Sequence, residues 1–183
     1  MLRADFWVYD ATFKRSEVAR FNSSRSSTYK KQAGNVNEGL FKGFSGMDNV
    51  NIGGLTIKDI KFLQINSVDN STFSIPNDGF MSLAYSNNIK PEVRPPLMTA
   101  IDKGFLPNKL FTVNVKGPFG DNKETQQGGR LVLGDYDNQN CGKVLGWAKF
   151  TSRSIYQVQV DSISYGGKPL INKPKQGKKN KLT

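Results

Sequence analysis

The stretch Val50-Asn51-Ile52-Gly53-Gly54-Leu55-Thr56-Ile57 sets two β-rich triplets on either side of a Gly-Gly pair. A two-residue hairpin turn needs backbone angles that glycine adopts without strain, and it matches the twist of the flanking strands. The stretch therefore predicts a β-hairpin whose turn is formed by the two glycines.

Two further runs are typical of strands. Residues 110–115 read Leu-Phe-Thr-Val-Asn-Val, and residues 156–160 alternate apolar with polar side chains. Residues 95–104 begin with two prolines and end with a glycine, which is the pattern of a short helix. We therefore expect an all-β protein with one short helix.

The composition limits the chemistry that the chain can perform. Its 183 residues include no histidine and a single cysteine, Cys141. The lack of histidine excludes Ser-His and Cys-His nucleophile pairs, and the single cysteine excludes an internal disulfide and a thiolate zinc site. We expect no metal site and no cofactor, so cofactor-free acid–base catalysis is left to carboxylates or lysines.

The net charge of +11 is distributed unevenly. Residues 1–31 carry seven Lys or Arg against three acids, residues 32–161 carry thirteen against twelve, and residues 162–183 carry six Lys and no acid. The composition of residues 168–183 predicts a disordered basic tail, either a solvated terminus or a site for an anionic partner. Nucleic-acid binding is disfavoured because aromatic residues are not interleaved with the lysines.

Several segments carry a recognisable pattern in a fixed order. They are Asp5-Phe6-Trp7-Val8, residues 21–29, residues 43–50 (Gly-Phe-Ser-Gly-Met-Asp-Asn-Val), residues 78–84 (Asp-Gly-Phe-Met-Ser-Leu-Ala), residues 110–113 and residues 128–134. In this order they resemble the amino-terminal lobe of pepsin-like aspartic peptidases. Residues 138–142 and 156–163 resemble the link into the family's second lobe, particularly in nematode-type members.

The resemblance implies a truncated two-lobed molecule. Residues 1–137 correspond to the amino-terminal lobe without its first strands, an incomplete barrel. Residues 138–167 correspond to the link and the first strand of the carboxy-terminal lobe, and residues 168–183 form the basic tail. An open sheet edge is expected to favour self-association.

The family's catalysis uses two aspartates that share one proton. The alignment at Trp7 places the first of them before Met1 and the second after Gly167, so no residue of this chain is a catalytic candidate. Asp5 cannot substitute because it lies too far along the strand. Asp78 is expected to be a structural carboxylate. The resemblance therefore implies an aspartic endopeptidase family member that is inactive as this chain.

The resemblance also implies a groove for a peptide or protein substrate. Its residues in this sequence are Trp7, Val36, Asn37, Glu38, Gly39 and Phe80. Val36 stands where the family has the flap tyrosine, and Ser82 stands where it has a glycine that braces the catalytic loop. These departures leave two alternatives, a non-catalytic peptide binder and an anion binder.

Two sequons and the family resemblance suggest a location. Asn22-Ser23-Ser24 and Asn70-Ser71-Thr72 fit the N-glycosylation pattern, so both asparagines are expected at the surface. The family implies an extracellular or lysosomal protein, although residues 1–5 lack the features of a secretory signal. No apolar run approaches the ~20 residues of a membrane span.

Overall fold

The computed structural model divides the chain into two compact units. One unit comprises residues 1–99 and 149–183, and the other comprises residues 100–148. The structure describes residues 6–38, 41–68, 77–85, 94–116, 128–152, 156–171 and 180–182.

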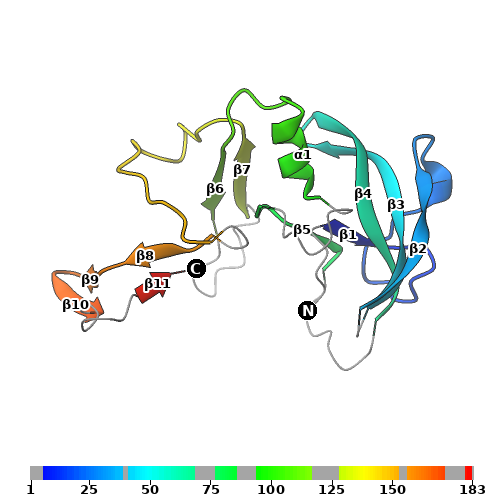
Figure 1. Cartoon of the computed structure of the whole chain (residues 1–183), viewed down its shortest axis with the longest axis horizontal. Coiled ribbons are helices and arrows are strands. Elements are labelled where there is room, and N and C mark those ends of the chain that lie inside the picture. Colours follow the sequence, from blue (N-terminus) through cyan, green and yellow to red (C-terminus); the bar gives the residue numbers. More distant parts are fainter. Residues whose placement is uncertain are drawn as a thin grey trace. The chain divides into compact units, whose positions relative to one another are not determined.

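The first unit is built on a five-stranded sheet. Its strands are β1 (Phe6–Tyr9), β2 (Lys30–Glu38), β3 (Phe41–Ile52), β4 (Leu55–Val68) and β5 (Gly79–Met81), in the spatial order β2-β3-β4-β1-β5. Figure 1 shows β2, β3 and β4 as a continuous meander. The β3–β4 hairpin closes at Gly53 and Gly54, as the sequence predicted.

The short strand β1 has neighbours on both sides. It runs parallel to β4, with Trp7 opposite Leu63, and antiparallel to β5, with Trp7 opposite Phe80. A parallel pair cannot be joined by a tight turn. The chain between β1 and β4 therefore contains the η1 turn (Ser23–Arg25) and the β2–β3 hairpin.

The predicted helix is present as α1 (Pro96–Asp102). Its Leu97 and Ala100 are buried, so the helix packs by one apolar face. No helix in the described ranges combines the length and apolar character that crossing a bilayer requires.

The second unit contains an antiparallel pair, β6 (Phe111–Val115) and β7 (Gly129–Leu133), in register from Phe111 opposite Leu133 to Val115 opposite Gly129. β6 lies in the run at residues 110–115 that was predicted as a strand, and β7 lies within residues 128–134, which belong to the family pattern. The described residues form mostly strands and one α-helix, which confirms the predicted all-β class. The strands of the described residues do not close into a barrel.

The carboxy-terminal segment differs from the predicted tail. β8 (Val158–Val160) and β9 (Ile163–Tyr165) are followed by β10 (Lys168–Ile171) and β11 (Asn180–Leu182), so two short strands lie within residues 168–183. β10 pairs with β9 because Gly166 and Gly167, with φ of 56° and 76°, form a two-residue turn. Residues 172–179 and Thr183 lie outside the described residues.

The core of the first unit lies against the sheet around β1. One cluster of buried side chains consists of Trp7, Tyr9, Phe13, Val18, Val36, Phe41, Leu63 and Ile65. Trp7 and Tyr9 alternate along β1, and Leu63 and Ile65 alternate along β4, so each strand contributes one face to this cluster.

Candidate functional site

Trp7 is the centre of the predicted groove, and the structure places it in the core. Its side chain is 6% exposed. The indole packs edge-on against Tyr9, with ring centroids 5.2 Å apart, and against Phe41 at 6.0 Å. Edge and tilted contacts of this kind stabilise aromatic pairs beyond their buried area. Trp7 thus fixes β1 to the β2–β3 hairpin.

The hairpin carries the predicted flap residues. Val36 belongs to the same buried cluster as Trp7. Valine has no hydroxyl group, so it contacts the cluster through apolar packing alone. Asn37 is exposed opposite Lys42, and Glu38 pairs with Phe41 along the backbone. Gly39 lies outside the described residues.

Phe80 is an exposed aromatic member of the predicted groove. It lies in β5 directly opposite Trp7, and its side chain is 51% exposed. Residues directly opposite each other in an antiparallel pair share one face of the sheet. The structure therefore places Phe80 next to Trp7 across the β1–β5 pair, and it places Trp7 and Val36 in one buried cluster; of these three side chains Phe80 is the exposed one.

Tyr9 is a residue near this site that the sequence analysis missed. It is 1% exposed, stacks on Phe13 at 4.2 Å, and its hydroxyl donates to Asn77 Oδ1 at 3.4 Å. Burial raises the pKa of the Tyr9 hydroxyl, so it stays a neutral donor. The alternation of Trp7 and Tyr9 in residues 6–9 is the pattern that could have indicated it.

Two carboxylates next to the sheet, Asp10 and Asp78, accept hydrogen bonds from neighbouring loops. Asp10 accepts from the Thr12 amide at 2.9 Å and its hydroxyl at 2.6 Å. Asp78 accepts from the Ala19 amide at 2.7 Å, which confirms its predicted structural role. These contacts fix loops next to the sheet rather than leaving a carboxylate free for proton transfer.

Asp48 is the most informative of these carboxylates because it is buried. Burial raises the pKa of the Asp48 carboxyl. The hydrogen bonds from Thr28, Ser26 and the Asn49 amide together lower it by more, so the resulting pKa lies below the ordinary value. The aspartate pair of pepsin-like peptidases needs a second carboxylate close enough to share a proton, whereas the groups that hydrogen-bond to Asp48 are hydroxyls and a backbone amide. Asp48 is therefore a structural group.

Comparison with known proteins decides the family. A family model described as eukaryotic aspartyl protease matches residues 3–178. The chain belongs to this family. The predicted pepsin-like relationship is confirmed.

Among curated relatives of this aspartyl protease chain are a cathepsin E, a pepsin A and an aspartic protease 2. Cathepsin E from Aquarana catesbeiana is 30% identical over 157 residues, which cover 83% of this chain and 38% of the relative. Pepsin A from Rhinolophus ferrumequinum is 28% identical over 166 residues, covering 87% and 41%. Aspartic protease 2 from Necator americanus is 30% identical over 154 residues, covering 79% and 36%. The chain spans about two fifths of the length of these relatives.

The remaining predicted sites of this aspartyl protease chain lie at the surface or outside the described residues. Asn22 is exposed, as expected, and its Oδ1 accepts from the Ser24 amide at 3.1 Å and the Ser24 hydroxyl at 2.8 Å. Asn70 lies outside the described residues. Cys141 is an exposed free thiol.

Proposed function

We propose that this chain forms the substrate-binding, amino-terminal lobe of a pepsin-like endopeptidase. The observation that carries the proposal is the position of Phe80, exposed on β5 and paired with the buried Trp7. A half-exposed aromatic side chain on a rigid strand offers apolar contact to a peptide side chain without a large loss of conformational entropy.

We also propose that these 183 residues do not cleave peptide bonds by themselves. Aspartic proteolysis needs two close carboxylates, one protonated and one ionised, to activate a water molecule. The chain contains no Asp-Thr-Gly or Asp-Ser-Gly triplet. Its buried Asp48 is held by hydroxyl and amide donors instead of a second carboxylate. In this proposal the lobe contributes to substrate binding, and catalysis requires carboxylates that these residues do not supply.

Subfamily and location follow as proposals from the same resemblance. We propose a nematode-type member, which the 30% identity to aspartic protease 2 of Necator americanus supports. We also propose an extracellular or lysosomal location with an N-linked glycan on the exposed Asn22. We further propose self-association through exposed hydrophobic side chains, of which Leu145, Tyr165 and Trp147 are the most accessible among the described residues.

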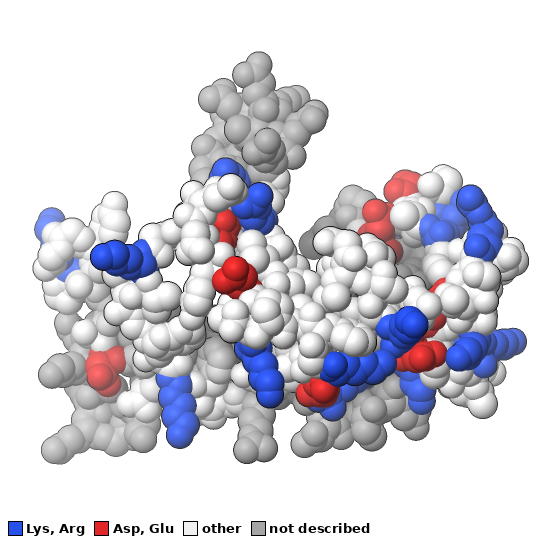
Figure 2. Space-filling view, turned by 90° about the horizontal axis from the view of Figure 1, so that it is seen from above, with Lys and Arg blue, Asp and Glu red and all other residues white. Residues whose placement is uncertain are grey.

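A non-catalytic peptide binder is the second candidate, and the same exposed Phe80 favours it. Nucleic-acid binding has less support. On the face shown in Figure 2, Lys and Arg side chains are interspersed with Asp and Glu instead of forming one continuous basic surface. Such mixed surfaces lack the electrostatic footprint of a nucleic-acid site.

Two assays test the proposed function. Incubation with a denatured protein from pH 2 to 7 is expected to yield no cleavage, and cleavage blocked by a pepstatin-type inhibitor contradicts the inactivity. Binding of a mixed peptide library is expected to weaken about fivefold in Phe80→Ser. The matched control is Tyr165→Ser, because Tyr165 is also an exposed strand aromatic. Equal binding by Phe80→Ser and the unaltered chain contradicts the proposed groove.

A further inference from the structure

A pocket of about 380 Å³ with partly apolar walls lies within the second unit. It is formed by Thr112 of β6 and by residues 136–138 and 141–144, which belong to the chain that follows β7. Tyr136 and Val144 supply exposed apolar side chains to the lining. A concave surface with apolar walls and a few polar groups is the usual form of a binding pocket.

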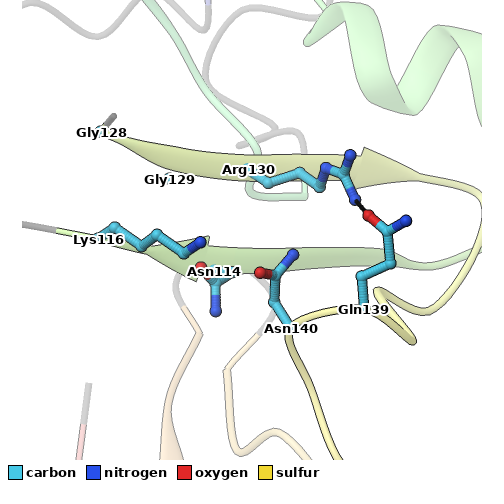
Figure 3. A pocket seen from close by; sticks show the side chains of 7 residues that line it. All are labelled: Asn114, Lys116, Gly128, Gly129, Arg130, Gln139 and Asn140. Atoms are coloured by element: carbon cyan, nitrogen blue, oxygen red, sulfur yellow. Dashed lines mark hydrogen bonds between the residues drawn. The ribbon is translucent and has the colours of Figure 1, made fainter. Parts of the chain in front are cut away.

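The turn that forms this pocket is fixed by polar contacts. Arg130 Nη1 donates to Gln139 Oε1 at 2.5 Å, which is the dashed contact in Figure 3. Asn140 Nδ2 donates to Asp137 Oδ2 at 2.8 Å, and Arg130 lies 3.5 Å from the Oδ1 atom of Asp137. A pocket whose walls are held in place beforehand loses less conformational freedom when it is filled.

Two polar side chains of the lining already have partners in the same unit. Asp137 is buried and is held by Asn140 and Arg130. The Thr112 hydroxyl donates to the Asp135 carbonyl oxygen at 3.0 Å. Removing polar groups from water is costly chiefly when they lack a hydrogen-bond partner. An apolar side chain can therefore fill the pocket without leaving these two groups unpaired.

The same unit exposes apolar side chains next to the pocket in the sequence. Residues 141–149 form neither helix nor strand and are exposed throughout. Among them Leu145 is fully exposed and Trp147 is mostly exposed, and neither of these two side chains lines the pocket. Tryptophan is the residue type most often found as the buried anchor of a protein interface, because its rigid ring offers a large contact area.

The pocket and the exposed side chains are adjacent, which suits a symmetric pair of chains. Val144 lines the pocket, and Trp147 follows three residues later. A two-fold axis can set this segment of each copy against the pocket of the other, so that both insertions form together. Lys143, which is exposed and lines the pocket, offers an ammonium group to the face of an inserted indole.

The area available is enough for a weak dimer. A tryptophan side chain buries about 150–250 Å² and covers a similar area of the pocket that receives it. With Leu145 at the rim, two insertions bury about 1,000 Å² in total, which is the low end of the range for specific interfaces. We therefore expect a dimer that forms reversibly at micromolar concentrations.

We propose that this pocket receives Trp147 of a second copy of the chain, while the pocket of the second copy receives Trp147 of the first. The inference rests on the self-association proposed above and adds its location, its symmetry and its stoichiometry of two.

Sedimentation equilibrium of the full chain tests the stoichiometry and the inserted side chain. A monomer–dimer equilibrium without larger species is expected, and Trp147→Ser should raise the dissociation constant more than about tenfold. Tyr165→Ser is the matched control, because Tyr165 is an equally exposed aromatic residue of the other unit. Equal losses of association in the two variants, or growth into larger species, overturn the proposal.

The single cysteine allows the pocket itself to be blocked. Cys141 is an exposed free thiol in the lining, so a bulky maleimide attached to it fills the pocket. The labelled chain is expected to be monomeric. The Cys141→Ser variant, which the reagent does not modify, is expected to dimerise before and after treatment. A labelled chain that dimerises like the unlabelled chain overturns the role of the pocket.

Mixing the two altered chains separates a matched contact from general adhesion. The Trp147→Ser chain keeps its pocket, and the maleimide-labelled chain, freed of excess reagent, keeps its Trp147. One insertion is therefore expected to form between them, although neither dimerises alone. If the unaltered chain dimerises but the mixture does not, the proposed contact is overturned and the self-association stands. A monomeric unaltered chain overturns both.

Discussion

Replacing Asp48 with Asn isolates the charge of one buried carboxylate. Asp48 lies in β3 and is 5% exposed. Its Oδ1 accepts from the Thr28 hydroxyl, and from the Asn49 amide at 2.7 Å. The substitution keeps the shape and an acceptor oxygen but removes the negative charge that these donors stabilise.

The expected cost follows from the strength of these contacts. Hydrogen bonds to a charged group contribute about 1.5–3 kcal/mol and those to a neutral group about 1 kcal/mol. Because asparagine retains part of this bonding, Asp48→Asn should lower the free energy of unfolding by about 1–2 kcal/mol at pH 6.

The sign of the pH dependence is fixed by the lowered pKa of folded Asp48. A carboxylate whose pKa is lower in the folded than in the unfolded chain stabilises the fold above the unfolded value of about 3.9. That contribution is lost as the pH falls through the folded pKa. The difference between Asp48→Asn and the unaltered chain should therefore shrink towards pH 2.

Urea denaturation at pH 6 and near pH 2, followed by circular dichroism, measures this difference. Asp161→Asn is the matched control, because Asp161 is exposed and is expected to change stability by less than about 0.5 kcal/mol. An Asp48→Asn midpoint equal to that of the unaltered chain at pH 6 refutes the reasoning. So does a cost that persists undiminished near pH 2.

Three further outcomes are expected. Leu63→Ala leaves a cavity at a fully buried position on β4 and should lower the free energy of unfolding by about 2–5 kcal/mol in urea denaturation. A decrease of less than about 1 kcal/mol contradicts the described packing of Leu63. When the chain is secreted from eukaryotic cells with a supplied signal, it should carry a glycan at Asn22, and the Asn22→Gln variant should lack this glycan. A mass that glycosidase treatment leaves unchanged contradicts glycosylation at Asn22. Size-exclusion chromatography should show self-association that Trp147→Ser reduces, because Trp147 is 79% exposed. A monodisperse monomer that unfolds cooperatively above about 60 °C contradicts this last expectation.

Features encoded locally were predictable from the sequence. The turn at Gly53 and Gly54 and the helix α1 depend on residue types at fixed offsets, and both occur where expected. The strand β10 was not predicted. The lysine and proline content of residues 168–183 indicated disorder, whereas the Gly166-Gly167 turn directly before them allows β10 to pair with β9. Composition describes the average of a segment, whereas two glycines suffice to reverse the chain.

The site was predictable only in part for a different reason. Trp7 and Val36 could be placed near each other by the resemblance, and the structure shows them in one buried cluster. The exposure of Phe80 depends on β5 being an edge strand, and the role of Tyr9 depends on the parallel pairing of β1 with β4. Such long-range pairings leave no mark in the residues between them.

The position of β1 between β4 and β5 has a consequence for the order of folding. The β2–β3 and β3–β4 pairs are hairpins that close over short loops, whereas β1 needs the finished edge of β4. Loop-closure entropy therefore favours late insertion of β1 into the sheet. The chain has two tryptophans, of which Trp147 is exposed and Trp7 is buried on β1. In a Trp147→Phe variant, the fluorescence change of Trp7 during refolding should consequently lag behind the far-ultraviolet circular dichroism of the meander.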